Sequence, residues 1–227
     1  HLGTEEQRMV VLEILRGETP GVYAQSEPEA GSDVARIRTT ARATNKDGIP
    51  GWEINGQKIW ISNAWLSNEK RANWCVVLAQ TGEIGDRRSM RFFLVRLETP
   101  GIEVSKINTN GMRGSGTSQI FFDHAFVPEN SLLGQGEAGF QTAMQVLGAS
   151  RIFFSARGLG ILEASIDNVA ERITAVRQSD SADSRLDAAT TRLSEMRVKA
   201  AYLSALLFHV ARLRDNGKPF ESEVASL

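Results

Sequence analysis

The chain has 227 residues, 41% of them hydrophobic and 23% charged, which is enough for one large or two modest folded domains. Its 26 basic and 27 acidic side chains leave a net charge of −1, so no excess of positive charge is available to bind nucleic acid. No apolar run approaches the ~20 residues that a membrane span requires.

The number and positions of the cysteine and histidine residues argue against a disulfide framework and against a metal site. Cys75 is the single cysteine, so an internal disulfide framework is impossible, and it lies in the apolar run 73–79. We therefore predict a buried structural thiol rather than a nucleophile, because nothing nearby would lower its pKa. The three histidines, His1, His124 and His209, are scattered, and no metal site is predicted.

The first predicted element is a short helix. Thr4 is suited to the N-cap position with Gln7 three residues later, the spacing of a capping box, and Gly17 stands where the helix should stop. The chain opens without methionine and ends just after a helical pattern. We expect both ends to be cut and residues 1–21 to be the tail of an N-terminal helical domain.

A period of two then dominates residues 22–134. Trp52–Ile54 and Lys58–Ile61 are predicted to form a hairpin around Asn55-Gly56, a pair that tolerates positive φ angles. Four later segments have strand character: 73–80, 90–97, 103–107 and 119–126. Short strands without intervening helices predict an antiparallel β-barrel or sandwich as the middle domain.

Residues 135–227 are predicted to be helical. Apolar side chains recur at helical spacing in two long stretches, and in the second the steps alternate between three and four residues. Two helices cannot bury such a stripe alone, so further helices or a partner subunit are expected. The predicted fold class is α+β, with a β middle domain followed by a truncated α-helical bundle domain.

Two segments carry the strongest functional signal. Tyr23–Asp33 contains several hydroxyl groups, backbone donors and a glycine turn within a short distance. Trp60–Asn63 places a large aromatic side chain beside a hydroxyl at the end of a predicted strand. A flat redox ring with polar edges needs both a face to lie against and donors along its rim. Taken alone, the first segment is equally typical of an acidic surface turn, and Trp60 of a core aromatic.

In order and spacing, these segments resemble the flavin-binding loops of the acyl-CoA dehydrogenase family, and the resemblance covers nearly the whole chain. It implies FAD as cofactor and α,β-dehydrogenation of an acyl-CoA thioester, with hydride transfer to flavin N5. It also implies an electron-transferring flavoprotein as electron acceptor and a homodimer or homotetramer. Bacterial cytoplasm and mitochondrial matrix both stay open as locations.

The resemblance assigns flavin contacts within the first segment to Tyr23, Gln25 and Ser26, with Ser26 donating to the pyrimidine edge. Gly31 and Ser32 would let the backbone pass close to the pyrophosphate or the pantetheine arm, so Ser32 would serve both cofactor and substrate. Gln25 stands where the family usually has an apolar residue. This difference has little effect on flavin binding if the residue contacts the flavin through its backbone.

In the second segment, the resemblance places Trp60 against the isoalloxazine ring, Ser62 near N5 and Ile61 between them. Serine stands at Ser26 and Ser62 where the family more often has threonine, so each hydroxyl is kept and a methyl group is lost.

The resemblance marks two arginines in the helical part. Arg151 is similar to an arginine close to bound substrate, although an interface or salt-bridge arginine fits the residue equally well. It is expected to open a helix after Ser150, a residue that occupies the base position of isovaleryl-type members and cannot accept a proton. No catalytic base is therefore assigned in this sequence. Arg177 corresponds to a family arginine that reaches the FAD of a neighbouring subunit, but the Phe-Gly that should follow is missing.

A glycine-rich segment, residues 111–117, matches the turn before the family's last β-strands. Arg113 within it would steer a CoA phosphate, or the segment is simply a flexible connection. Two other functions stay open for the whole chain: an acyl-CoA oxidase or flavin monooxygenase of the same fold, and a non-catalytic fragment that lacks the base.

Overall fold

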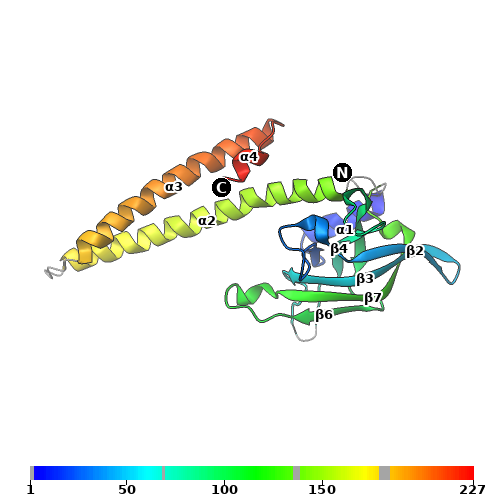
Figure 1. Ribbon diagram of the computed structural model, residues 1–227. Coiled ribbons are helices and arrows are strands. Elements are labelled where there is room, and N and C mark those ends of the chain that lie inside the picture. The colour runs from blue at the N-terminus through cyan, green and yellow to red at the C-terminus, as the bar shows by residue number, and fades with distance from the viewer. Residues whose placement is uncertain (1–2, 68–69, 135–138, 179–184) are drawn as a thin grey trace. The chain divides into compact units, whose positions relative to one another are not determined.

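A computed structural model describes residues 3–67, 70–134, 139–178 and 185–227 (Figure 1). Tertiary contacts divide the chain into two compact units, His1–Thr142 and Ala143–Leu227. The first contains a curled β-sheet and the second is helical, so the predicted α+β fold class is confirmed. The predicted boundary between residues 134 and 135 meets a segment outside the described residues.

Helix α1, Glu5–Leu15, begins as the sequence predicts. The Gln7 backbone N–H donates to the Thr4 hydroxyl (3.3 Å) and the Thr4 N–H donates to the Gln7 amide oxygen (2.9 Å), which completes the capping box. Gly17 follows the helix with a φ of 74°. The buried Gln7 amide also donates to the carbonyl oxygens of Asn130 and Leu132, so this cap fastens α1 to the β-unit.

Seven strands form one sheet, in which β3, β7 and β6 lie side by side (Figure 1). The strands are β1 Gly21–Ala24, β2 Thr40–Lys46, β3 Ile49–Ile61, β4 Trp74–Gln80, β5 Met90–Arg96, β6 Ile102–Lys106 and β7 Ser118–Pro128. The order is β1-β4-β2-β3-β7-β6, and β5 pairs with β4. The four later strands confirm the predictions to within two residues at each end.

The sheet is mixed, so the prediction of a purely antiparallel sheet was wrong at two pairings. β1 runs parallel to β4, and β2 meets β4 in parallel at Thr40 and Gln80. Neither β1 nor β2 is joined to β4 by a tight turn, because other elements intervene along the chain, so nothing forces these neighbours to run in opposite directions. The sequence also missed β2, because five of its seven side chains are exposed and show no alternation.

The predicted hairpin around Asn55-Gly56 was wrong. β3 runs unbroken from Ile49 to Ile61, and the turn that precedes it is Asp47-Gly48, with φ angles of 54° and 83°. Asn55-Gly56 instead forms a β-bulge against β7, where Gly56 has a φ of 144°. The expected turn and the observed bulge both place a residue at positive φ, so the Asn-Gly signal alone could not distinguish them.

A hydrophobic core fills most of the interior of the β-unit and includes Cys75, Val77, Phe93, Ile54 and Ile120. The Cys75 side chain is fully buried, and burial raises the pKa of its thiol to about 12. The thiol is therefore protonated at neutral pH, which confirms the prediction of a structural cysteine.

The second unit is built on two long helices, α2 Gly139–Gln178 and α3 Arg185–Asp215, followed by α4 Glu221–Val224. Seven-residue spacing places buried side chains along the seam between the long helices: Ile152, Leu159, Ile166 and Ile173 on α2, with Leu193, Ala200 and Leu207 on α3. The predicted helical bundle seam is confirmed. Arg151 lies inside α2, so the expectation that it opens a helix was wrong.

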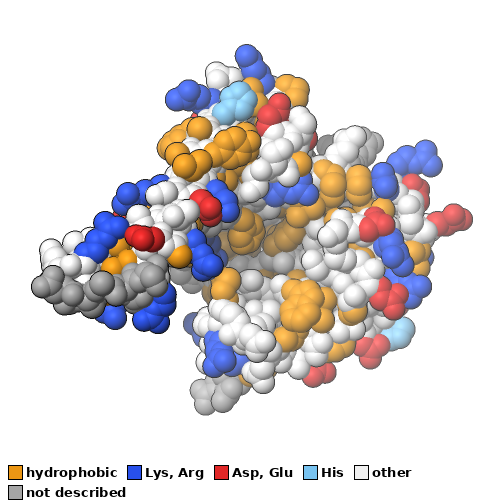
Figure 2. Space-filling view, turned by 60° about the vertical axis from the view of Figure 1, so that its left-hand side comes forward, with side chains coloured by type: hydrophobic (Ala, Val, Ile, Leu, Met, Phe, Trp, Pro, Cys, Tyr) orange, Lys and Arg blue, Asp and Glu red, His pale blue; other side chains and the backbone are white. Residues whose placement is uncertain are grey.

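Other apolar side chains of these helices are exposed, as the space-filling view shows (Figure 2). They include Phe153, Phe154 and Ile161 of α2 and Val198 and Tyr202 of α3. At roughly 100° per residue, Phe154, Ile161, Val198 and Tyr202 face away from the α2–α3 seam. The Phe153 ring lies beside it, with the Arg214 guanidinium of α3 6.0 Å from the ring centroid. In the part of the chain that the structure describes, no helix is long and apolar enough to cross a membrane.

Gly56→Ala should destabilise the β-unit by about 2–4 kcal/mol, because an added Cβ would lie 2.5 Å from the Thr39 hydroxyl and 2.7 Å from its Cα. Gly114→Ala is the matched control: its Cβ would meet no atom within 4 Å, and the change should stay within about 0.5 kcal/mol. Urea unfolding of both variants measures the difference, and equal midpoints would contradict the bulge geometry.

Candidate functional site

The two functional segments identified from the sequence lie against each other. The Ile59 N–H donates to the Ser26 carbonyl oxygen at 2.9 Å, which joins the loop after β1 to the end of β3. Ser26 therefore lies next to the residue that precedes Trp60. Residues 33 positions apart in the sequence thus lie side by side at the end of β3.

Trp60 is presented to solvent by a bulge. The pairing of β3 with β7 shifts register between Lys58 and Ile61, and Trp60 has a φ of 63°. Such a conformation costs a bulky residue about 1–3 kcal/mol. The Trp60 side chain is 60% exposed, so it is not a core aromatic. Strain that exposes a large indole is the kind of feature that marks a binding surface.

The residues around Trp60 face in different directions. The Ile61 side chain is buried in the β-unit, so only its backbone is available to a ligand, whereas Ser62 is exposed. Asn63 also has a positive φ, 64°, and its N–H donates to the Ser115 carbonyl oxygen at 2.6 Å. This bond brings the glycine-rich segment 111–117 to the same end of β3.

Close packing explains one glycine of that segment. Gly116 has a φ of 54°, and a Cβ there would come within 1.9 Å of the Trp65 carbonyl oxygen. Arg113 of the same segment is exposed. Together with residues 106–110, Arg113 lines an open cavity of about 330 Å³.

The first segment makes a tight turn before it reaches the surface. Glu27 and Ala30 exchange two backbone hydrogen bonds (3.0 and 3.1 Å), and Gly31 and Ser32 beyond them are exposed. A Cβ added at Gly31 would meet no protein atom within 4 Å. Packing does not require glycine there, so the space beside the backbone is free for a ligand, as the pyrophosphate of FAD would require.

Tyr23 and Gln25 are turned toward each other. The Tyr23 hydroxyl donates to the Gln25 amide oxygen at 2.5 Å, and the Tyr23 ring lies 5.9 Å from that of Phe92. Burial raises the pKa of the Tyr23 hydroxyl, which is therefore protonated at neutral pH. The Gln25 side chain is buried and paired with Tyr23, and its backbone carbonyl oxygen accepts from the Lys58 ammonium at 3.1 Å, so a ligand contact at Gln25 would fall to its backbone N–H.

A buried ion pair beneath this site was missed by sequence reasoning. The Lys58 side chain is 0% exposed, and its ammonium lies 2.7 Å from the Glu27 carboxylate and 3.1 Å from the Gln25 carbonyl oxygen. The same carboxylate accepts hydrogen bonds from the backbone N–H groups of Arg38 (2.6 Å) and Thr39 (3.0 Å). Nothing in the sequence distinguishes Lys58 or Glu27 from surface residues of a strand and a turn.

Burial and ion pairing shift the pKa values of Glu27 and Lys58 in opposite directions. Burial tends to raise the pKa of Glu27, but the charge of Lys58 and the hydrogen bonds to the carboxylate outweigh it and hold the pKa below 4.5. Burial lowers the pKa of Lys58, although Glu27 favours its charged form. We assign the ionised pair at neutral pH, because the carboxylate receives three donors at 3.0 Å or less.

The two arginines predicted as site residues belong to the helical unit. Both lie on α2, where 26 residues separate them by about 39 Å along the helix axis at 1.5 Å per residue, so they cannot contact one ligand group together. Arg151 is exposed, and the Arg177 guanidinium donates to the Thr190 hydroxyl of α3 at 3.1 Å. Residues 179–184, which follow Arg177, lie outside the described residues.

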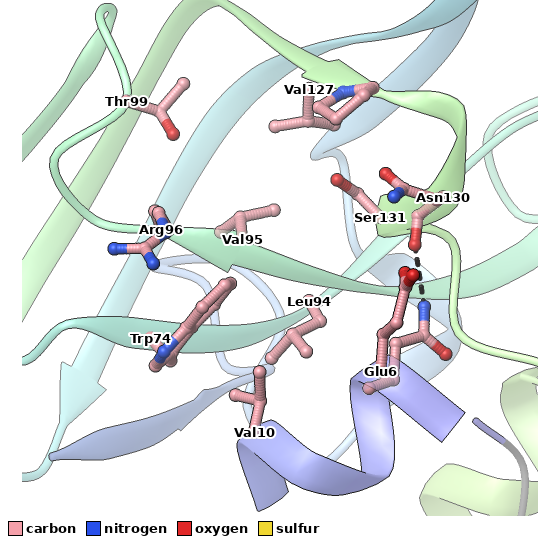
Figure 3. Close-up of a pocket in the computed structure, with 12 residues that line it drawn as sticks. Glu6, Val10, Trp74, Leu94, Val95, Arg96, Thr99, Val127, Asn130 and Ser131 are labelled. Atoms are coloured by element: carbon pink, nitrogen blue, oxygen red, sulfur yellow. Dashed lines mark hydrogen bonds between the residues drawn. The ribbon is translucent and has the colours of Figure 1, made fainter. Parts of the chain in front are cut away.

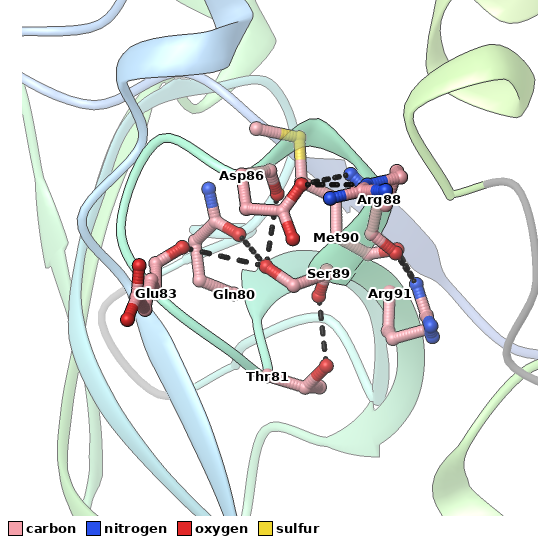
Figure 4. Close-up of polar contacts among 8 residues, drawn as sticks. All are labelled: Gln80, Thr81, Glu83, Asp86, Arg88, Ser89, Met90 and Arg91. Atoms are coloured by element: carbon pink, nitrogen blue, oxygen red, sulfur yellow. Dashed lines mark hydrogen bonds and ion pairs between the residues drawn. The ribbon is translucent and has the colours of Figure 1, made fainter.

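A second polar cluster holds the β4–β5 hairpin (Figure 4). The Thr81 hydroxyl donates to the Ser89 carbonyl oxygen at 2.8 Å, and the Ser89 hydroxyl lies 2.6 Å from the buried Gln80 amide. Asp86 caps the short turn that follows by accepting from the Arg88 N–H at 3.0 Å. These bonds lie within the hairpin, and we assign them to its stability.

A cavity of about 260 Å³ opens between α1 and the sheet (Figure 3). Val10, Trp74 and Leu94 form its apolar wall, with Arg96 over the Trp74 ring and Glu6 and Ser131 at the rim. Its lining includes none of the residues predicted to bind flavin. Among the described residues, no group of three His, Cys, Asp or Glu side chains could hold a metal ion.

Comparison with known proteins identifies both units. Residues 22–125 match the acyl-CoA dehydrogenase middle domain, and residues 137–227 match the acyl-CoA dehydrogenase C-terminal domain. The chain is 34% identical over 229 residues to the mitochondrial short-chain specific acyl-CoA dehydrogenase of Homo sapiens, covering 98% of this chain and 52% of that protein. It thus spans about half the length of the curated relatives it matches.

Two solved structures share the fold. Butyryl-CoA dehydrogenase from Megasphaera elsdenii has a TM-score of 0.84 at 28% identity, covering 99% of this chain and 57% of the other. A structure of PigA with FAD and proline has a TM-score of 0.85 at 25% identity, covering 99% of this chain and 57% of the other.

The acidity of Glu27 yields a pH prediction. A carboxyl whose pKa is lowered by folding contributes stability above its ordinary pKa of 4.5 and loses it as the pH falls through the folded value. At pH 7, Glu27→Gln should therefore cost about 3 kcal/mol, and the difference from wild type should shrink as the pH falls below 4.5. Urea unfolding at pH 7 and pH 3.5 measures both values.

Glu29→Gln is the control on the same loop, since Glu29 forms an exposed pair with Arg38 at 3.5 Å. Its cost should stay below about 0.5 kcal/mol at either pH. If the cost of Glu27→Gln were independent of pH, the assignment of an ionised pair would be incorrect.

Proposed function

The chain belongs to the acyl-CoA dehydrogenase family, and we propose that it supplies the flavin-binding portion of an FAD-dependent enzyme that dehydrogenates an acyl-CoA thioester. The observation that carries this proposal is the exposed, strained Trp60 beside the Ser26 loop. An exposed indole offers a flat apolar wall, and the adjacent loop offers polar groups at its edge.

The residues present fit an isoalloxazine and its pyrophosphate. Trp60 would supply the wall, while the hydroxyls of Ser26 and Ser62 would donate to the polar edge of the ring system. Ser32 and the open backbone at Gly31 would accommodate the pyrophosphate or the pantetheine arm. When bound, FAD supplies the hydride acceptor; the protein groups hold the ring and exclude water from one of its faces.

We assign three further residues to supporting the proposed flavin site without side-chain contact to the cofactor. Tyr23 and Gln25 support one another through their side-chain hydrogen bond, and we assign only the backbone N–H of Gln25 to the cofactor, because its carbonyl oxygen accepts from Lys58. The buried side chain of Ile61 fixes the backbone between Trp60 and Ser62. We assign no catalytic base, because Ser150, next to Arg151, cannot accept the α proton.

The helical unit supports the remaining parts of the proposal. We assign Arg151 to substrate binding and Arg177 to the FAD of a neighbouring subunit, with Arg177 leaving Thr190 on binding. The exposed apolar faces of α2 and α3 favour burial against further helices or a second copy, as in a homodimer or homotetramer. An electron-transferring flavoprotein is the proposed electron acceptor of the complete enzyme.

Flavin binding tests the proposal. The purified chain should quench FAD fluorescence on titration, and Trp60→Ala should weaken the affinity about tenfold, because stacking on an aromatic ring is worth about 1–3 kcal/mol. Ile84→Ala is matched in exposure, at 58% against 60% for Trp60, and should leave the affinity unchanged. Equal FAD affinity in wild type and Trp60→Ala would remove the basis for the assignment.

The thioester part of the proposal needs a separate measurement. Anaerobic addition of butyryl-CoA to the FAD-loaded, complete enzyme should bleach the flavin absorbance, because the hydride would reduce the ring. A flavin that is bound but stays oxidised under saturating butyryl-CoA would contradict the substrate class while leaving the cofactor site intact.

A further inference from the structure

Two consecutive residues of β3 hold three consecutive residues of the flavin-facing loop. The Lys58 ammonium donates to the Gln25 carbonyl oxygen (3.1 Å) and to the Glu27 carboxylate (2.7 Å). Between these two contacts, the Ile59 N–H donates to the Ser26 carbonyl oxygen at 2.9 Å. Ser26 therefore cannot shift along β3 without breaking one of these bonds, and Trp60 is the next residue of that strand.

The same carboxylate also closes the far end of the loop. Glu27 accepts from the N–H groups of Arg38 (2.6 Å) and Thr39 (3.0 Å), which lie 11 and 12 residues further along the chain. The segment between them carries Gly31 and Ser32. One buried side chain thus fixes both ends of the loop on which the proposed pyrophosphate contacts lie.

Stability alone does not account for this arrangement. Removing two charges from water offsets much of their attraction, and an apolar pair of similar volume often stabilises a fold as well or better. An apolar pair, however, would make no hydrogen bond to the Gln25 carbonyl oxygen and none to the N–H groups of Arg38 and Thr39. The directional bonds define where the loop lies, which is a requirement for presenting donors to a rigid ring.

We propose that Glu27 and Lys58 are positioning residues for the flavin: through their buried contact they set the Ser26 loop against Trp60, and neither touches the cofactor. This inference rests on the proposed flavin site. It predicts that cofactor binding depends on the pair more strongly than folding does.

The test uses the double variant Glu27→Gln/Lys58→Met beside the wild-type chain. Gln and Met approximate the volumes of the native side chains and leave no unpaired buried charge, so the melting temperature should stay within a few degrees of wild type. The FAD affinity should nevertheless fall at least tenfold. At saturating FAD, the bound flavin should also fluoresce more strongly than in wild type, because its ring no longer stacks on Trp60.

Glu29→Gln is the control, since its exposed pair with Arg38 lies on the same loop and leaves Lys58 untouched. It should match wild type in melting temperature, FAD affinity and flavin fluorescence. The single variant Lys58→Met should show the affinity loss of the double variant with a lower melting temperature, because it leaves the Glu27 charge buried and unpaired.

The remaining outcomes overturn the inference in distinguishable ways. A double variant that binds FAD like wild type would show that the pair does not position the loop. A double variant that does not fold, or that loses affinity only in proportion to its melting temperature, would make the pair structural. Wild-type chain that binds no FAD would overturn the proposed function and this inference with it.

Discussion

A lysine ammonium buried inside the β-unit is the constraint around which the proposed flavin site is organised. Lys58 has no exposed surface, so its charge requires the Glu27 carboxylate and a backbone carbonyl as partners. Those partners belong to a loop that is distant in sequence, and meeting the requirement draws that loop onto β3. The geometry of the surface is thus set by an interaction buried beneath it.

Two bulges in β3 shape the exposed surface above that buried pair. β3 departs from regular pairing with β7 at two places, one at Asn55-Gly56 and one between Lys58 and Ile61. The first lets Thr39 approach closer than any Cβ would permit, and the second turns Trp60 out of the sheet. A regular strand would alternate side chains between its two faces and could not place an inward lysine, an outward indole and an inward isoleucine at this spacing.

Prediction from the sequence succeeded where a short sequence pattern corresponds to a single local structure. The Thr4–Gln7 capping box, the later strands and the seven-residue seam of α2 and α3 each follow from a short pattern, and the structure confirms them. Prediction failed where the same short pattern is compatible with two local structures. The pair Asn55-Gly56 indicates positive φ, but only the pairing with neighbouring strands decides between a turn and a bulge. Most side chains of β2 are exposed, so its sequence shows no alternation of apolar and polar residues.

The sequence by itself determined the fold class and the buried thiol at Cys75, and it singled out the two segments of the proposed site, because periodicity, apolar runs and turn residues act over a few positions. Only the tertiary structure decided that Ser26 and Trp60 are neighbours, that Trp60 faces solvent and that Glu27 and Lys58 pair. Those facts depend on strand register and on contacts across 31 or more residues, and no local pattern encodes which distant partner a buried charge will find.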